Sequence, residues 1–448
     1  MLQLIRGNIN FIGGIMLEKF FNLKAHKTNV KTEVVAGITT FMTMAYILAV
    51  NPLILGDAGM STSGVFLATA IAAGLATIIM ALYAKYPFAL APGMGLNAFF
   101  AYTVVAKYGF TWQEALFIIL IEGIIFILLS FFKVRELIFD SIPLDLKNAV
   151  SAGIGLFIAL IGLSNAGIVT NQGGTILSMS DITQAGPLLA IIGVLLTGFL
   201  VAKKVKGAIL IGIVVTTLIG LPMGVTVIPE GFVPFSLPHD LGEVAFKLQM
   251  PKNLFSTEVL LAIFTFLFVD MFDTVGTLAG ISSKANMLDE NGKLPRVERA
   301  LLSDAIGTTA GALLGTSTVT TFVESSAGVA EGGRTGLTAL TTGALFLLAV
   351  FFAPLFLLIP SQATAPALII VGLFMISPIA KIDWEDFTVS VPAFLTIIMM
   401  PFGYSIAEGI VFGMISYTIL KVLTGKHKEV SLLMYVISVL FILRYIFL

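Results

Sequence analysis

Two aspartates and two threonines lie on one side of an otherwise apolar segment. In FVDMFDTVGTLAG (residues 268–280), Asp270, Asp273, Thr274 and Thr277 are spaced i, i+3, i+4 and i+7, which places them on one helical face. Carboxylates grouped with hydroxyls can hold a proton or accept charge-assisted hydrogen bonds from a ligand's N–H groups. The stripe therefore predicts a binding or proton-carrying surface; a structural network that joins helices is the simpler alternative.

A third acid and an amide lie in two segments whose backbone is not expected to be regular helix. TSTVTTFVESSAGVAEGGRTG (316–336) opens with residues that favour extended backbone, and Glu324 follows at the expected start of a short helix. APGMGLNAFFAYTVV (91–105) carries proline and glycines near its start, and Asn97 occupies the corresponding place. Because helix starts favour anions, both side chains are predicted to point toward one central site.

The elements that position these residues are predicted to be membrane helices. Hydrophobic residues make up 57% of the 448 residues, charged residues make up 11%, and the mean hydropathy is +1.02. Soluble proteins carry about a quarter charged residues, so most of this surface is expected to face lipid. Apolar runs predict an all-α polytopic membrane protein. The expected segments are 34–54, 62–84, 90–106, 113–132, 146–163, 186–202, 206–222, 257–280, 298–314, 317–330, 335–358, 365–379, 387–402 and 405–423.

The distribution of positive charge supports fourteen spans. With the N-terminus in the cytoplasm, most of the 25 lysine and arginine residues fall on the cytoplasmic side. The polar stretch near 223–255 divides the spans into two sets of seven, and an odd number inverts the second set. The two irregular segments are third in each set, and such a pair is typical of a transporter's binding site at mid-membrane. The run 430–447 stays undecided between a span and an interfacial helix.

Composition and missing motifs exclude several functions. The chain has no cysteine and only three histidines, all in polar segments, so no metal site is expected in the membrane. The absence of basic clusters argues against nucleic acid as a partner. A GxGxxA match at 93–98 lacks a soluble βαβ context, so no cofactor is expected. Two alternatives are an enzyme such as a two-aspartate protease and a channel, but both acids share one helix and the polar residues converge on one locality.

The motifs AGITTFMTMAYILAVNPLIL, APGMGLNAFFAYTVV, FVDMFDTVGTLAG and TSTVTTFVESSAGVAEGGRTG together resemble the adenine/guanine/hypoxanthine permeases of the nucleobase–cation symporter superfamily. The resemblance runs from about residue 16 to 428. It implies two inverted seven-span repeats, with short antiparallel strands before the half-helices of segments three and ten. The implied organisation is an N-terminal cytoplasmic segment (1–33), a first repeat (34–222; core 34–132, gate 146–222), an extracellular connection (223–256), a second repeat (257–428; core 257–358, gate 365–423) and a C-terminal hydrophobic segment (429–448).

The resemblance also implies what is transported and by which residues. It implies import of purine nucleobases across the plasma membrane by proton symport, with Asp270 and Glu324 as substrate-binding acids. Asn97, Asp273 and Phe322 would lie beside them, Phe99 or Phe322 would stack on the base, and Thr274 and Thr277 would support Asp273. Close acids repel, which favours retention of a proton. Uracil, xanthine or a small anion as substrate, sodium as the coupled ion and a homodimeric assembly stay open. We interpret residues 1–15 as an extension of little functional weight.

Overall fold

The computed structural model describes residues 17–131, 142–171, 177–285, 287–289 and 294–447 of the chain. The proposed extension at residues 1–15 lies outside this part. Within it, helices form at nearly every predicted segment, as the apolar runs require. Nine helical runs among the described residues, some of them made of consecutive elements, are long and apolar enough to cross a bilayer. Three further apolar helices are shorter: Ala208–Gly220, Phe387–Phe402 and Leu432–Leu443. The chain is therefore a multi-pass membrane protein.

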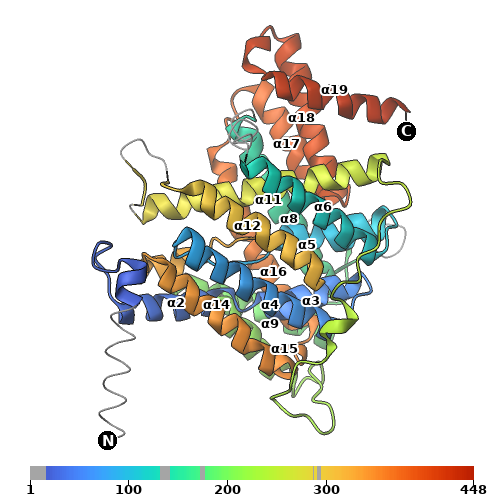
Figure 1. Cartoon of the computed structure of the whole chain (residues 1–448). Helices are drawn as coiled ribbons and strands as arrows, with labels where there is room; N and C mark the ends of the chain where they lie inside the picture. Colours follow the sequence, from blue (N-terminus) through green and yellow to red (C-terminus); the bar gives the residue numbers. More distant parts are fainter. Residues whose placement is uncertain (1–16, 132–141, 172–176, 286, 290–293, 448) are drawn as a thin grey trace, which may run out of the picture.

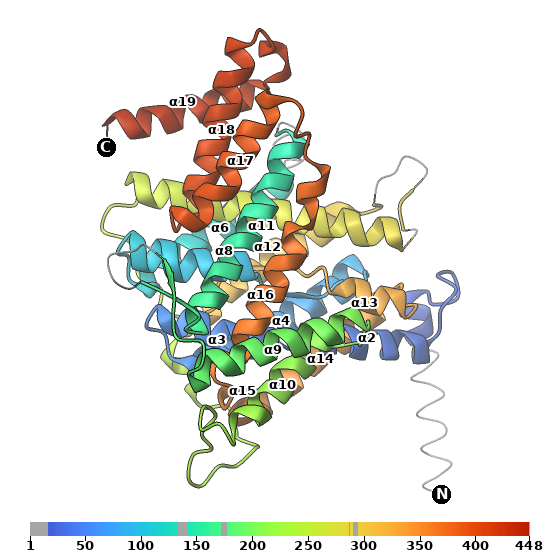
Figure 2. The same ribbon diagram turned by 180° about the vertical axis from the view of Figure 1, so that it is seen from behind.

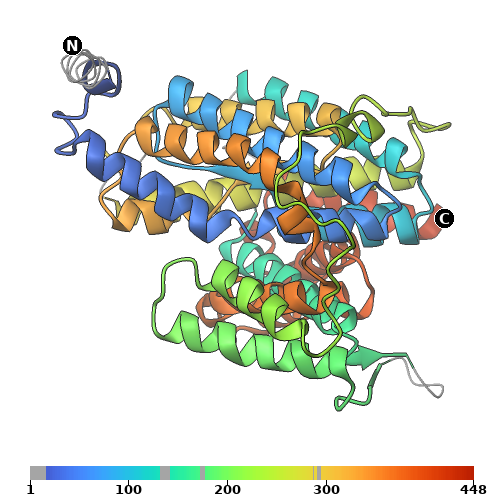
Figure 3. The ribbon, with the colours of Figure 1, turned by 90° about the horizontal axis from the view of Figure 1, so that it is seen from below.

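The first group of elements surrounds the sheet formed by β1 and β4, and we call it the strand-bearing bundle after these two strands. It is drawn mainly in blue, yellow and orange and forms the upper layer in Figure 3. Its elements are α2 (Val30–Met44), α3 (Ile47–Asp57), α4 (Thr62–Ile79), the π-helix η1 (Met80–Ala84), β1 (Leu90–Pro92), α5 (Met94–Ala98), the π-helix η2 (Phe99–Lys107), α6 (Trp112–Phe131), α11 (Thr257–Lys284), α12 (Val297–Leu314), β4 (Val319–Thr321), α13 (Ser325–Ala330), α14 (Gly336–Ala349), the 3₁₀ turn η4 (Val350–Phe352) and α15 (Ala353–Leu357).

The remaining long helices pack against one another as a second bundle (Figures 1 and 2). Helices α8 and α16 form its centre, and the pairs α9–α10 and α17–α18 lie against them. Its elements are α8 (Leu144–Asn165), β2 (Val169–Thr170), β3 (Ser178–Met179), α9 (Ala185–Ala202), α10 (Ala208–Gly220), α16 (Ser361–Ile376), the 3₁₀ turn η5 (Ser377–Lys381), α17 (Phe387–Phe402) and α18 (Ile406–Leu423). The 3₁₀ turns η3 (Asp240–Glu243) and η6 (His427–Glu429) and the helix α19 (Leu432–Phe447) complete the structure.

Polar residues inside the strand-bearing bundle join elements that are distant in sequence. The buried carboxylate of Glu33 on α2 accepts hydrogen bonds from the backbone N–H groups of Arg334, Thr335 and Thr338, at 3.0, 3.3 and 3.2 Å. These N–H groups belong to the first turn of α14 and the residues before it, which lack partners within the helix. Helix α2 is thus fixed to a helix about 300 residues later in the chain.

Candidate substrate site

The two irregular segments meet as strands, which confirms the predicted strands before the short helices. β1 and β4 pair in antiparallel register, with Leu90 opposite Thr321 and Pro92 opposite Val319. Threonine and valine favour extended backbone, and Pro92 lies at the end of its strand, where its missing N–H costs little. Irregular backbone at membrane depth is tolerated only where protein covers it. Both strands are buried accordingly.

Helix α11 presents its acidic face to α12 and β4. Asp270 is fully buried, and its Oδ2 accepts a long 3.4 Å hydrogen bond from the hydroxyl of Thr308 on α12. One turn later, the hydroxyl of Thr274 donates to Oδ1 of Asp304 at 2.9 Å and lies 2.7 Å from the hydroxyl of Thr320 on β4. The predicted stripe therefore faces protein rather than lipid.

Glu324 occupies the N-cap position of the short helix α13, as the sequence predicts, but its side chain makes no capping hydrogen bond and is held by a tyrosine. The hydroxyl of Tyr46, in the break between α2 and α3, donates to Oε1 of Glu324 at 2.8 Å. Tyr46 is almost completely buried, so this is a charge-assisted hydrogen bond shielded from water. The backbone of Glu324 accepts a further, longer bond from the hydroxyl of Thr43 at 3.5 Å. The carboxylate of Glu324 is thus oriented by Tyr46, at the junction of α2 and α3.

Asn97 does not occupy the place that corresponds to Glu324. Helix α5 is capped by Gly93, and Asn97 lies inside the helix, whereas Glu324 is itself the cap of α13. The side-chain oxygen of Asn97 accepts a short hydrogen bond from the hydroxyl of Ser317, just before β4. The prediction that the two side chains are equivalent is wrong, because β1 leads into its helix after one residue and β4 after three. Asn97 joins the two irregular segments instead.

The two predicted aromatic residues are buried close to the short helices. Phe99 is fully buried, and its ring meets that of Phe266 on α11 edge-to-face at 4.8 Å between centroids. Phe322 is 6% exposed and follows β4 directly, and its N–H donates to the carbonyl of Ala89 at 3.0 Å. Thr277 is buried on α11 one turn beyond Asp273. Phe99 therefore has a packing partner on α11, and Phe322 is fixed through its backbone.

Electrostatic repulsion links α11 to the two elements beside it. Asp273 is close enough to Glu324 and to Asp304 for both carboxylates to repel it. Glu324 is thus coupled to α11 through Asp273, one helical turn from Asp270. The arrangement can accept hydrogen bonds from a planar ligand's N–H groups and hold an exchangeable proton.

The sequence interpretation missed two residues of this network. Asp304 accepts hydrogen bonds from Thr274 and from Thr321, at 2.9 and 3.0 Å, and so joins α11, α12 and β4. Asp304 could have been found from the sequence, because it is an acid within an apolar run, and placing an acid in a membrane is energetically costly unless it has a function. Tyr46 gave no comparable signal, since a tyrosine among apolar residues is ordinary packing until its partner is known.

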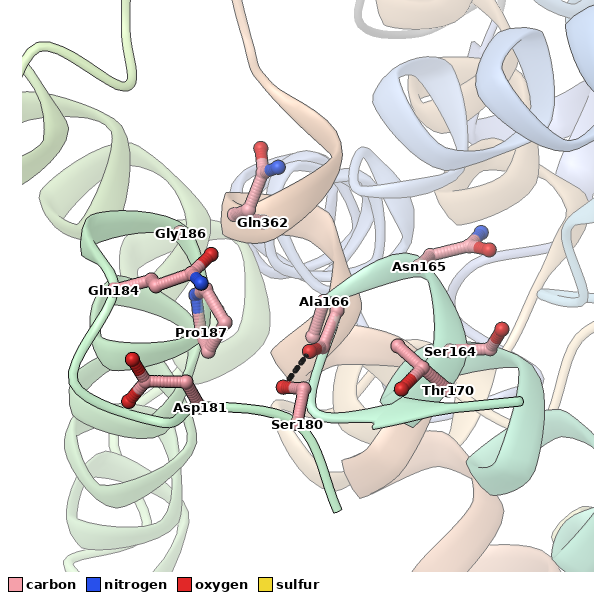
Figure 4. A pocket seen from close by; sticks show the side chains of 11 residues that line it. Ser164, Asn165, Ala166, Thr170, Ser180, Asp181, Gln184, Gly186, Pro187 and Gln362 are labelled. Carbon is pink, nitrogen blue, oxygen red and sulfur yellow. Dashed lines mark hydrogen bonds between the residues drawn. The ribbon is translucent and has the colours of Figure 1, made fainter. Parts of the chain in front are cut away.

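A polar cavity of about 620 Å³ lies elsewhere, at one end of the second bundle (Figure 4). It is lined by the ends of α8, α9 and α16 and by the loop between α8 and α9, with Asn165, Asp181, Gln184 and Gln362 among its side chains. None of the predicted site residues lines it. This cavity is therefore separate from the acids around β1 and β4.

Comparison with known proteins decides the family. The Permease family model, labelled for xanthine and uracil permeases, matches residues 31–412. The chain belongs to this permease family. It is 45% identical to the adenine permease AdeP of Escherichia coli, with 96% of each chain covered. It is 47% identical to the guanine/hypoxanthine permease PbuG of Bacillus subtilis, with 96% of this chain and 100% of PbuG covered.

Further relatives place the permease among transporters. The putative permease MJ0326 of Methanocaldococcus jannaschii is 49% identical, with 96% of this chain and 98% of that protein covered. The transmembrane domain of the cyanobacterial bicarbonate transporter BicA has a similar structure, with a TM-score of 0.61 at 15% identity over 86% of this chain and 97% of that one. This last likeness shows the fold alone. The permease is thus a transport protein and not an enzyme.

Proposed function

We propose that this permease imports purine nucleobases, with Asp270 and Glu324 contacting the base. The support is the pair of fixed carboxylates on different elements, one on α11 and one capping α13. A purine is flat and carries N–H donors on its edges, so two carboxylates can accept bonds from different edges. The adenine and guanine/hypoxanthine permeases among its relatives support the same substrate class.

The acidic character of the site argues against a small anion as substrate. An anion would require a positive group at the short helices, whereas Glu324 and the nearby Asp273 are there. Uracil and xanthine are the remaining alternatives, since both also present N–H donors. We propose that the coupled ion is a proton, carried by one of the three acids Asp270, Asp273 and Glu324, because Asp273 and Glu324 repel each other and a proton on either removes that repulsion.

The experiment uses purified protein in liposomes with a proton or a sodium gradient imposed separately. We expect labelled adenine, guanine or hypoxanthine to accumulate with the proton gradient, and uracil to accumulate less. Glu324→Gln and Asp270→Asn should each abolish accumulation. Glu114→Gln makes the same chemical change at an exposed end of α6 and should leave it intact. Gradient-driven uptake retained in both site variants would refute the proposed site.

We also propose fourteen spans arranged as two inverted repeats in the plasma membrane, with the N-terminus in the cytoplasm. The nine long helices, the shorter α10 and α17, helix α12 and the two strand-containing segments together support this number. The strand-bearing bundle would be the core and the second bundle the gate. Transport would then move the core past the gate and carry the site from one side of the membrane to the other.

Contacts between the bundles provide a test of this movement. Lys206, in the turn between α9 and α10, forms a 2.5 Å ion pair with Glu331 at the end of α13. A moving core must break this pair. Because the chain has no cysteine, Lys206→Cys with Glu331→Cys can be joined by a short bis-thiosulfonate. We expect uptake to stop and to recover with reductant. Lys421→Cys with Glu429→Cys, which replaces a pair beside α18, should permit uptake when joined. Normal uptake by the first double variant after joining would refute the movement.

A further inference from the structure

Helix α19 runs back along α18 for most of its length. The hydroxyls of Thr418 and Ser438 lie 2.8 Å apart near the middle of the pair, and Ser438 also donates to the carbonyl of Met414 at 3.2 Å. Toward the far end, the hydroxyl of Tyr445 donates to the carboxylate of Glu408, in the first turn of α18. Residue numbers rise along α19 as they fall along α18. The two helices are therefore antiparallel neighbours.

The side of α19 that faces away from the protein is apolar. It consists of residues that recur at helical spacing, all between 41% and 80% exposed: Leu432, Val436, Val439, Leu440, Leu443 and Ile446. The opposite side, with Met434, Ser438 and Phe441, is buried against the rest of the chain. A helix lying at the membrane surface carries a polar face toward water. Apart from Tyr445, whose hydroxyl bonds Glu408, the exposed side chains described on α19 are apolar, so they form no such face; the side chain of Arg444 lies outside the described part.

The length of α19 matches that of a neighbour in the same bundle. It has 16 residues, as does α17, which corresponds to about 24 Å at 1.5 Å per residue. This is slightly less than the hydrocarbon thickness of about 30 Å and is tolerated by local thinning. In both Figures 1 and 2, the C-terminal end of α19 lies on the side of the molecule where α11 begins. Helix α18 begins on the same side, as the Tyr445–Glu408 contact requires.

We propose that α19 is an additional membrane-crossing helix, so that its C-terminal end lies on the outer side, opposite the cytoplasmic end of α18. The run 430–447 would then be a span and not an interfacial helix. The inference goes beyond the proposed transport function, because it concerns the topology and would stand whatever the permease carries.

A second consequence concerns the two bundles. The ring of Phe441 meets that of Phe264 on α11 edge-to-face, at 5.4 Å between centroids. Helix α19 is hydrogen-bonded to α18 in the second bundle, and this ring contact joins it to the acid-bearing helix of the strand-bearing bundle. Helix α19 therefore contacts both bundles, and Phe264, its partner on α11, precedes Asp270 by six residues.

Single cysteines in the cysteine-free chain test the topology. Leu448→Cys, Lys428→Cys and, in the connection between α10 and α11, Glu230→Cys are treated in intact cells with a membrane-impermeant maleimide. Labelling is normalised to that after permeabilisation. We expect Leu448→Cys and Glu230→Cys to react in intact cells, and Lys428→Cys only after permeabilisation. Equal accessibility of Leu448→Cys and Lys428→Cys, from whichever side, would refute the crossing.

The control position separates two kinds of failure. If Lys428→Cys reacts in intact cells while Glu230→Cys and Leu448→Cys do not, the proposed orientation of the whole permease is inverted and the crossing by α19 stands.

We infer that the contact between Phe441 and Phe264 affects the movement of the two bundles. Phe441→Ala tests this against Leu440→Ala, which changes a neighbour that faces away from the protein. We expect several-fold slower uptake for Phe441→Ala, with unchanged binding of the labelled base and unchanged elution of the detergent-purified protein. Equal uptake rates in the two variants would refute a role of the Phe441–Phe264 contact in transport.

Discussion

The hydrogen bond from Tyr46 to Glu324 offers the most specific test of the proposed site. Tyr46→Phe removes one hydroxyl and leaves the buried ring in place. A hydrogen bond to a charged group contributes about 1.5–3 kcal/mol, and the bond here is 2.8 Å long and shielded from water. Since each 1.4 kcal/mol is a tenfold change, we expect purine affinity to fall by roughly 10- to 100-fold if this bond orients the carboxylate.

The assay measures binding of labelled base to purified Tyr46→Phe and wild-type protein, with thermal unfolding followed in parallel. Tyr435→Phe is the matched control, because its hydroxyl bonds only a backbone carbonyl, that of His427, at 3.1 Å on the exposed surface. Its affinity should equal that of the wild type. Glu324→Gln keeps an acceptor for Tyr46 but removes the charge, and should bind worse than Tyr46→Phe. Unchanged binding by a folded Tyr46→Phe protein would show that the tyrosine does not orient the carboxylate for the base. Tighter binding would show that the tyrosine competes with the base, and either result would contradict the proposed role.

Three further predictions concern the elements that hold the site. Asp304→Asn removes the charge that Thr274 and Thr321 share, and we expect a lower melting temperature together with slower uptake; wild-type values for both would show that the charge is dispensable. Gly328→Ala should destabilise the protein by about 1–3 kcal/mol, because the added methyl would meet the carbonyl of Ala36 at 2.6 Å. Gly276→Ala is the control and should not destabilise it, because a methyl there meets nothing within 4 Å. Equal melting temperatures for these two variants would contradict the close packing of α13 on α2. The Lys426 ammonium holds the pKa of Asp386, which caps α17, below its usual range. A lowered folded-state pKa adds stability that is present above the ordinary pKa, about 4, and is lost as the pH falls further. The melting-temperature difference between wild type and Asp386→Asn should therefore be present at pH 7 and should shrink in acid. A difference independent of pH would contradict this.

Much of the architecture could be predicted because a bilayer imposes simple rules. Every backbone polar group must be satisfied within the membrane, so apolar runs became helices at almost the predicted boundaries. The same rule marked the segments around Pro92 and Val319 as irregular, and they are strands. Acids on an apolar helix are costly, which is why Asp270 and Asp273 could be selected from sequence.

What the tertiary structure decided is which distant residues meet. Spacing along a helix gives a face but not the partner opposite it, so the bonds from Thr274 to Asp304 and from Tyr46 to Glu324 required the packed fold. The lengths of the turns after β1 and β4 separated Asn97 from its supposed equivalent, a difference of two residues that periodicity cannot detect. Sequence determined that acids had to be buried, because hydrocarbon does not solvate charge. The fold decided what solvates them, because only packing brings hydroxyls from α11 and β4 to the carboxylate of Asp304 on α12.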